Sequence, residues 1–307
     1  FRGDVSLLAP GTDALTALTG RPTFGVVPWH EGLAFDVEDS LSQPTTLPDA
    51  GPPLGRDRLR VAAVRLPRTS NATDVDSLAC EPGVGVRWTT SPGDVADADL
   101  VVLPGTRATV ADLDWLRRTG IADAVVARAA AGRPLLGICG GYQMLADRID
   151  DDVESGAGAV AGLGLLPVRV VFAAEKQVGR PAGSAYGEPV TTAYEVHHGV
   201  ARSVARAGDT GLEPFLDGYR SGAVWGTTWH GAWESDGFRR AFLADVADLA
   251  GRDFVPAKDV EVAALRTARL DLLGDLVEAH LDTTTLEAVI TGGPPSGLPF
   301  VPPGAPV

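Results

Sequence analysis

The sequence is poor in cysteine and has no long apolar run. Its two cysteines, Cys80 and Cys139, lie far apart, which excludes the disulfide framework of small secreted proteins. No charged segment followed by an apolar stretch opens the chain, and no run of about 18 apolar residues occurs. These absences predict a protein of the reducing cytoplasm that does not span a membrane.

Basic clusters and several binding motifs are also missing. The 307 residues carry a net charge of −14, and Lys and Arg form no block, which argues against a nucleic-acid partner. The HExxH and CxxC patterns of zinc sites, a Ser-His-Asp elbow and the GxxxxGK[ST] phosphate loop do not occur. We therefore expect no metal site and no P-loop in this stretch.

Composition divides the chain into unequal parts. The first forty residues are too few to bury a core and resemble the end of a domain, with a helix at Asp13–Thr19 and a strand at Thr23–Pro28. Because the chain begins with Phe1 rather than Met, we expect its natural start to lie upstream. The predicted parts are a domain remnant (1–41), a Pro- and Gly-rich linker (42–58), a full domain (59–250), a helical extension (251–290) and a disordered tail (291–307).

From residue 59 onward, short apolar strands alternate with helices. The predicted strands are Leu59–Leu66, Val84–Thr89, Asp99–Leu103 and Leu135–Ile138, and the predicted helices are Val110–Arg117 and Ile121–Ala131. This alternation is typical of an α/β fold whose parallel sheet is covered on both faces. Chemistry collects beyond the carboxyl ends of such strands, where Cys139 and the Pro104–Gly105 turn both fall.

The remainder of the domain is richer in β-structure. We expect Glu175–Gly187 to form a mobile polar loop. The other predicted elements are strands at Leu165–Phe172, Val190–Val196 and Ala223–Trp229, and helices at Asp236–Leu249 and Val260–Leu281.

Cys139 lies where an apolar strand passes through a glycine-rich turn into a helix. Gly137, Gly140 and Gly141 permit the sharp turn of a nucleophile elbow, which would leave the sulfur exposed above the sheet edge. The positive end of the helix would favour thiolate over thiol. The alternative is a buried structural cysteine, but the spacing of the glycines favours a nucleophile.

A nucleophilic thiol needs a base, and the chain has five histidines. His230 follows a predicted strand, so its ring would project from a strand end as Cys139 does; a histidine that only caps the turn is the alternative. His197 and His198 are neighbours on a strand and would face opposite sides, so they are not expected to share a metal, although one could contact substrate. His30 and His280 lie outside the α/β domain.

Eight short segments give the sequence a resemblance to a known family. They are Phe1–Asp4, Gly25–Pro28, Glu38–Leu41, Arg65–Asn71, Leu103–Thr106, Gly137–Met144, Tyr194–His197 and Gly226–Gly231. The elbow and the later histidine resemble those of class I glutamine amidotransferases. More narrowly, the Arg65–Asn71 segment, followed by Asp74 and Asp76, is similar to the cobyric acid synthase family of the cobalamin pathway.

The resemblance implies a class I glutamine amidotransferase-like, flavodoxin-like three-layer sandwich with a mostly parallel sheet, preceded by the C-terminal remnant of a P-loop-type ATPase domain. It implies that Cys139 attacks glutamine, that His230 is the base, and that N–H groups of Gly140 and of the Gly105–Thr106 turn hold the oxyanion. The ammonia would amidate a corrinoid, adenosylcobyrinic acid a,c-diamide. No cofactor is implied for the amidotransferase domain, whereas ATP and Mg²⁺ are implied for the missing upstream domain.

The sequence departs from the family pattern at two places. Arg107 replaces a lysine after the Pro-Gly turn, and His198 replaces a methionine. Class I relatives outside the cobalamin branch carry a glutamate that orients the histidine at the position of Ala232, so the resemblance implies a Cys139–His230 dyad with Glu234 as a candidate substitute. The alternatives are an amidotransferase subunit that acts on a cell-wall lipid precursor and a cysteine hydrolase on the same fold. Candidate cations for corrinoid carboxylates are Arg65, Arg68, Arg107, Lys176 and Arg180.

Overall fold

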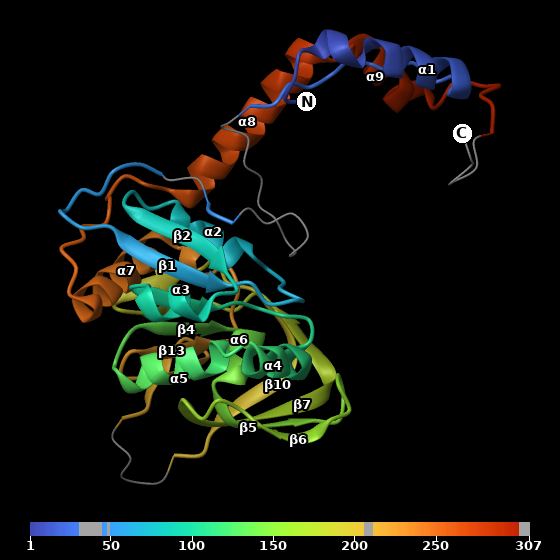
Figure 1. Ribbon diagram of the computed structural model, residues 1–307. Helices are drawn as coiled ribbons and strands as arrows, with labels where there is room; N and C mark the ends of the chain where they lie inside the picture. The colour runs from blue at the N-terminus through green and yellow to red at the C-terminus, as the bar shows by residue number, and fades with distance from the viewer. Residues whose placement is uncertain (31–44, 48–49, 206–210, 301–307) are drawn as a thin grey trace. The chain divides into compact units, whose positions relative to one another are not determined.

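The computed structural model describes residues 1–30, 45–47, 50–205 and 211–300 (Figure 1). The chain forms two compact units. Unit 1 combines Phe1–Phe35 with Ala264–Val307, and unit 2 comprises Asp36–Ala263. Within the described residues, none of the helices has the length and apolar character needed to cross a bilayer.

A seven-stranded sheet forms the centre of unit 2. Five strands are parallel, in the order β13, β4, β3, β1, β2, and β11 and β12 extend the β13 side as antiparallel strands. The strands are β1 (Leu59–Val64), β2 (Val84–Thr89), β3 (Leu100–Leu103), β4 (Leu135–Ile138), β11 (Glu213–Phe215), β12 (Gly218–Ser221) and β13 (Val224–Thr227). The mostly parallel α/β sheet expected from the sequence is confirmed.

Helices cover both faces of this sheet. Along β1, Leu59, Val61 and Ala63 belong to one core cluster and Ala62 and Val64 to another, because side chains alternate across a strand. The first cluster includes α2 and α7, and the second includes α3 to α6, which gives a three-layer sandwich. The helices are α2 (Thr73–Ala79), α3 (Pro92–Asp97), α4 (Thr109–Arg118), α5 (Ile121–Ala130), α6 (Gly140–Met144), the 3₁₀ turn η2 (Ala232–Glu234) and α7 (Asp236–Ala250).

A second sheet of four strands has the order β10, β7, β5, β6. Its strands are β5 (Ala146–Asp151), β6 (Gly158–Ala161), β7 (Leu166–Gly179) and β10 (Glu195–Ser203), and a separate hairpin joins β8 (Gly183–Ala185) to β9 (Glu188–Val190). The predicted mobile loop Glu175–Gly187 is therefore wrong. Its residues belong largely to β7 and β8, and they are polar because most of them face solvent.

The segment Val190–Val196, expected as one strand, contains the end of β9 and the start of β10. Between them, the Thr191 N–H donates to Ser235 Oγ at 3.1 Å, and Thr192 Oγ1 donates to the carbonyl oxygen of Gly231 at 2.7 Å. These bonds tie the segment to the start of α7 rather than to a strand partner.

Unit 1 is helical and buries little of its own surface. Its elements are the 3₁₀ turn η1 (Val5–Leu8), α1 (Ala9–Thr19), most of α8 (Val262–His280) and α9 (Thr283–Gly292). The predicted strand Thr23–Pro28 is wrong, because only a single bridge joins Gly25 to Leu281 and no ladder extends it. Leu18 and Ile290 remain exposed.

Parts of the predicted linker and tail lie outside the described residues, as does the Glu38–Leu41 segment. Within the linker, Thr46 bridges Arg87, and the Leu47 N–H donates to Val86 O at 3.1 Å, so this part follows edge strand β2. The predicted disordered tail 291–307 begins inside α9, which ends at Gly292, and residues 301–307 are not described. The division into a synthetase remnant, an amidotransferase domain and an extension stays a prediction.

Candidate active site

The turn at Cys139 has the backbone of a nucleophile elbow. β4 ends at Ile138, α6 begins at Gly140, and Cys139 between them has φ 49° and ψ −110°, a conformation that side-chain-bearing residues rarely adopt. A Cβ at Gly141 would lie 2.0 Å from the carbonyl oxygen of Leu103, so the elbow packs directly on the end of β3. The sharp turn expected from the glycine spacing is present.

The expected exposure of the Cys139 sulfur is wrong. Cys139 is only 7% exposed. It lines a cavity of about 390 Å³ that Phe172 of β7 and Val196 of β10 also line, together with the loop at Thr106. The second sheet, whose position the sequence did not predict, thus covers the elbow. A substrate must enter this cavity to reach the thiol.

His230 lies in the same cavity and is held by a buried carboxylate. It follows β13, and its Nδ1 lies 2.7 Å from Asp74 Oδ2, with both side chains 1% exposed. The other oxygen, Asp74 Oδ1, accepts from the Gly231 N–H at 2.6 Å. Because Asp74 occupies Nδ1, the opposite ring nitrogen, Nε2, is the one available for proton transfer.

Tyr194, the residue before β10, supports the same imidazole through an isolated bridge to His230. The rings of Tyr194 and His230 stack with centroids 5.3 Å apart, and their main chains exchange two hydrogen bonds of 2.9 and 3.0 Å. Asn71, with φ 55°, donates from Nδ2 to Tyr194 Oη at 3.1 Å. The contacts at His230 therefore bring together two segments that carried the family resemblance, Arg65–Asn71 and Tyr194–His197.

The charge on His230 is shifted toward the imidazolium. Burial lowers the pKa of His230, but the Asp74 carboxylate and Cys139, each through charge and a hydrogen bond, outweigh burial and raise this pKa to about 10. The protonated ring is thus the ordinary resting form near neutral pH. Such a ring is ready to donate a proton to a leaving group.

Asp74 was not predicted as a site residue, and the predicted substitute was wrong. The acceptor at His230 Nδ1 is Asp74 of α2, not Glu234 of η2. The sequence held one signal, the Asp74 that follows the Arg65–Asn71 segment. The structure thus places a third side chain, Asp74, against the His230 ring, which shares the cavity with Cys139.

The Gly105–Thr106 loop is rigid and lies against both catalytic groups. Thr106 Oγ1 bonds Asp112 Oδ2 at 2.5 Å and Arg68 O at 3.1 Å. A Cβ built on Gly140 would lie 3.2 Å from the Thr106 nitrogen, so these two backbone amides are neighbours. Within the described residues, the structure records no acceptor for either N–H. Because Gly105 has no side chain, it leaves room for the His230 ring, whose Cε1 would lie 2.8 Å from a Cβ at this position.

His197 and His198 both line the cavity, contrary to the expectation that neighbours on a strand face opposite sides. The register between β10 and β7 shifts between His197 and Gly199, and this irregularity breaks the alternation. His197 Nδ1 lies 2.9 Å from Gly199 O, and His198 Nδ1 lies 3.0 Å from Ala173 O. Among the described residues, no group of three or more His, Cys, Asp or Glu could hold a metal ion.

Alanine at Gly105 is expected to displace the base. Its Cβ would lie 2.8 Å from His230 Cε1 and 3.0 Å from Ser70 O, so the imidazole must move. Misplacing a catalytic group by such amounts lowers kcat roughly ten- to hundredfold. Turnover at this site should fall in Gly105→Ala but not in Gly85→Ala, where the nearest atom, Leu59 O, is 3.9 Å away. Equal activity in the two variants would contradict this role of Gly105.

Comparisons with known proteins agree with this geometry. A family model described as the CobB/CobQ-like glutamine amidotransferase domain matches residues 60–238. The cobyric acid synthase of Streptomyces avermitilis is 59% identical over 310 residues, which cover 100% of this chain and 60% of that protein. The cobyric acid synthase of Rhodococcus jostii is 56% identical over 311 residues, which cover 98% of this chain and 59% of that protein.

The chain thus spans about 60% of the length of these curated relatives. A solved structure described as a crystal structure of glutamine amidotransferase is 21% identical, covers 62% of this chain and 98% of that chain, and has a TM-score of 0.45. The family model covers more than half of the chain and confirms the resemblance seen in the sequence. The chain belongs to the family of CobB/CobQ-like glutamine amidotransferase domains.

Proposed function

We propose that this chain is the glutamine-hydrolysing part of a cobyric acid synthase. The observation that carries the proposal is the buried Asp74–His230 pair beside Cys139 in one cavity. The names of the relatives supply the pathway, and the chain spans about 60% of their length. The ammonia would amidate peripheral carboxylates of adenosylcobyrinic acid a,c-diamide to give cobyric acid.

In the proposed reaction, the Cys139 thiolate attacks the side-chain amide carbon of glutamine, and a carbon–sulfur bond forms. The carbonyl oxygen becomes an oxyanion between the N–H groups of Gly140 and Thr106, whose amides are neighbours. His230 gives its proton to the departing nitrogen, so ammonia leaves and a thioester remains. His230 then takes a proton from water, which attacks the thioester and releases glutamate and the thiolate.

Asp74 keeps the reacting nitrogen in place through both steps. Its bond to Nδ1 fixes the ring orientation and stabilises the imidazolium when His230 carries two protons. The Asp74 bond to the Gly231 N–H anchors the carboxylate to the main chain that carries the histidine. The base and its partner therefore move as one group.

ATP and Mg²⁺ enter the proposal only through the part of the relatives that this chain does not span. The GxxxxGK[ST] loop that would cradle the phosphates does not occur in the sequence. Exposed apolar side chains of unit 1, such as Leu18 and Ile290, support the proposal that this unit belongs to the synthetase part. A cytoplasmic location is proposed from the two unpaired cysteines.

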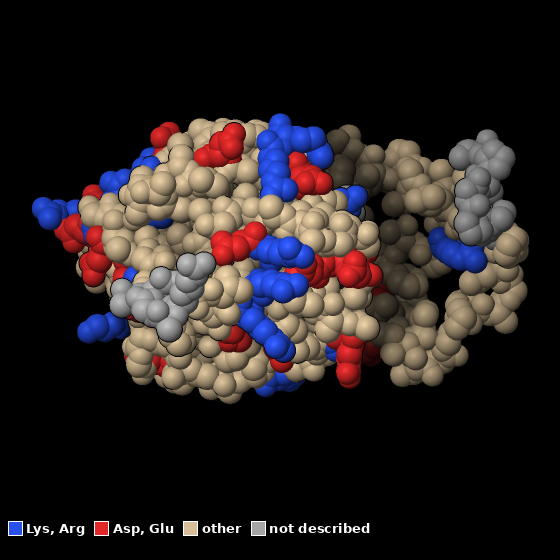
Figure 2. Space-filling view, turned by 90° about the horizontal axis from the view of Figure 1, so that it is seen from below, with Lys and Arg blue, Asp and Glu red and all other residues tan. Residues whose placement is uncertain are grey.

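A corrinoid with several carboxylates needs local cations on a chain of net charge −14. Figure 2 shows that Lys and Arg side chains form a band on one face, with Asp and Glu beside it. Of the cations predicted from the sequence, Arg107 and Lys176 line the cavity at Cys139, where the carboxylate of glutamine must also be balanced. We therefore assign these two to glutamine.

The test is labelling with a diazoketone analogue of glutamine, which alkylates a thiol only after it binds as glutamine does. We expect one label, on Cys139, and protection by glutamine. Cys80 is an internal control because it is also buried and reduced. Labelling that glutamine does not prevent would favour a cysteine hydrolase, and absence of label would contradict the proposal.

A further inference from the structure

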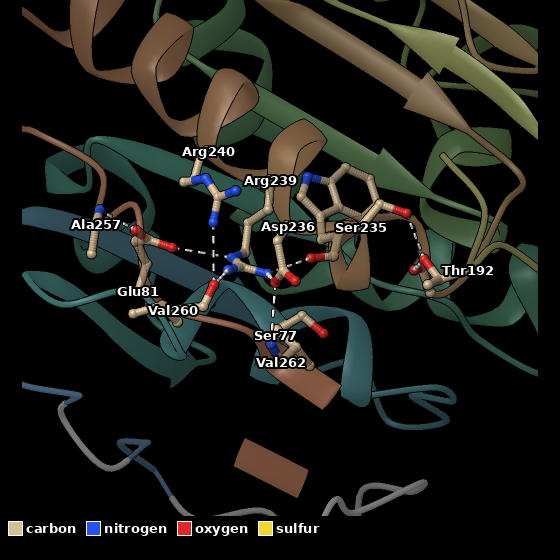
Figure 3. A network of polar contacts seen from close by, with 12 residues as sticks. Ser77, Glu81, Thr192, Ser235, Asp236, Arg239, Arg240, Ala257, Val260 and Val262 are labelled. Carbon is tan, nitrogen blue, oxygen red and sulfur yellow. Dashed lines mark hydrogen bonds and ion pairs between the residues drawn. The ribbon is translucent and has the colours of Figure 1, made fainter. Parts of the chain in front are cut away.

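Helix α2 is attached at both ends to the segment 230–240. At its first turn, Asp74 bonds the ring of His230. Just beyond its last turn, Glu81 Oε2 accepts from Arg239 Nε at 3.1 Å, as Figure 3 shows. The two carboxylates are seven positions apart in the chain, which corresponds to about 10 Å along a helix. The two bonds thus hold both ends of α2.

The bond at the far end is a fully buried ion pair. Glu81 and Arg239 are both 0% exposed. The guanidinium also bonds Asp236 Oδ1 at 2.6 Å and Trp233 O at 3.2 Å. Because the pair is shielded from solvent, a displacement that separates the two groups would weaken a buried charge interaction. The additional hydrogen bonds of the guanidinium further restrict its geometry.

The same cluster holds a connecting strap, residues 257–262, which leads into α8. The Ala257 N–H donates to Glu81 Oε1, and Val260 O accepts from Arg239 Nη2 at 3.2 Å. The Val262 N–H donates to Asp236 Oδ1 at 3.1 Å. Figure 3 shows the strap residues Ala257, Val260 and Val262 around these charges. Three backbone groups of the strap therefore depend on the charges that hold α2.

The orientation of α2 depends on these attachments. A helix of seven residues has little stability of its own, so contacts with the rest of the fold determine its position. The 2.7 Å bond from Asp74 to His230 weakens steeply when its length or angle changes. A small displacement of α2 at Glu81 would therefore change the length or angle of the Asp74–His230 hydrogen bond.

We propose that the Glu81–Arg239 pair is a positioning element for the Asp74–His230 bond, and that the strap reaches the active site through this pair. The proposal rests on the proposed glutamine hydrolysis. Glu81 and Arg239 do not touch substrate; they act through α2 and Asp74. A purely structural role would lower stability without changing the properties of His230.

The test compares Arg239→Met with Arg128→Met in the whole chain. Arg128 is an equally buried arginine, 3% exposed, whose donors bond the carbonyl oxygens of Val95, Asp99 and Pro134, none of them on α2. Both variants should lose thermal stability. Only Arg239→Met should lower kcat for glutamine hydrolysis, by roughly ten- to hundredfold, with little change in KM.

A second readout does not depend on activity. The titration of the His230 ring is followed by nitrogen NMR, with Asp74, Cys139 and Tyr194 as the groups that face it. In Arg239→Met the pKa of His230 should fall relative to the wild type, and in Arg128→Met it should not. An unchanged titration and kcat in Arg239→Met would overturn the proposal, as would equal losses in both variants.

If Arg239→Met does not fold, two more conservative variants test the same proposal. Glu81→Gln keeps an acceptor for the Ala257 N–H but removes the charge opposite Arg239, and Asp99→Asn does the same to a buried carboxylate that bonds Arg252. A fall in kcat and in the His230 pKa is expected in the first variant only. Wild-type protein that neither hydrolyses glutamine nor takes the diazoketone label would instead refute the proposed function.

Discussion

Alanine in place of Cys139 is expected to reduce kcat for glutamine hydrolysis by two to four orders of magnitude or more. The reason is that, in the proposed reaction, the sulfur forms the covalent bond to the substrate, and no other thiol lies in the described part of the cavity. Glutamate release from glutamine by the purified chain measures the effect. The cavity itself should persist, because Cys139 contributes little volume to it.

The control is Cys80→Ala, which removes the second buried thiol and should leave kcat unchanged. If the full-length protein carries out the proposed corrinoid amidation, Cys139→Ala should still support it when ammonium replaces glutamine. Failure with ammonium would show that Cys139 matters for folding or coupling instead. Wild-type glutamate release by Cys139→Ala would refute its assignment as nucleophile.

Asparagine in place of Asp74 is expected to lower kcat roughly 10²- to 10⁴-fold, the range for a group that orients and charges a catalytic histidine. Asparagine can present an amide N–H where His230 Nδ1 needs an acceptor, so the ring would lose its orientation. The matched control is Glu234→Gln, the carboxylate that sequence reasoning favoured, and we expect its kcat to stay near that of the wild type. A larger loss of kcat in Glu234→Gln than in Asp74→Asn would instead indicate that Glu234 orients His230.

The same substitution should change how stability depends on pH. The pKa of His230 is raised in the folded protein to about 10 from an ordinary 6.5, despite burial, by Asp74 and Cys139. Between these values the folded state holds a proton that the unfolded chain has lost, so the free energy of unfolding falls as pH rises.

The stability that Asp74 supplies through His230 is therefore complete below pH 6.5 and disappears as pH approaches 10. For one proton, the slope is at most about 1.4 kcal/mol per pH unit. Urea unfolding of the wild type and Asp74→Asn between pH 6 and 9.5 measures it. The difference between the two curves reports the contribution of Asp74. A difference that grows with pH would contradict the ion pair.

Local patterns were enough to select Cys139 and His230 as candidates, and the structure places both in one cavity. The elbow is encoded within a few residues by Gly137, Gly140 and Gly141, and the strand before His230 is continuous. Asp74 could not be found in this way, because a carboxylate on a short helix carries no local sign of the ring it will meet. Its identification required the packing of α2 against η2.

The second sheet explains the errors within unit 2. The end of β7 is polar and lacks apolar alternation, so its sequence predicts a loop where the structure has a strand. The register shift at Gly199 depends on how β10 pairs with β7, which no single-strand pattern contains. Because this sheet covers the elbow, missing it also led to the wrong expectation that Cys139 is exposed.

The bond between Asp74 and His230 joins residues 156 positions apart in the chain. Closing so long a loop costs conformational entropy, which the pairing of the intervening strands must offset. The elbow also depends on distant residues, because Gly141 packs on Leu103 of β3 and the Cys139 N–H donates to Thr227 O at 2.8 Å. The turn at Cys139 and the position of His230 are therefore properties of the assembled sheet and not of two short segments.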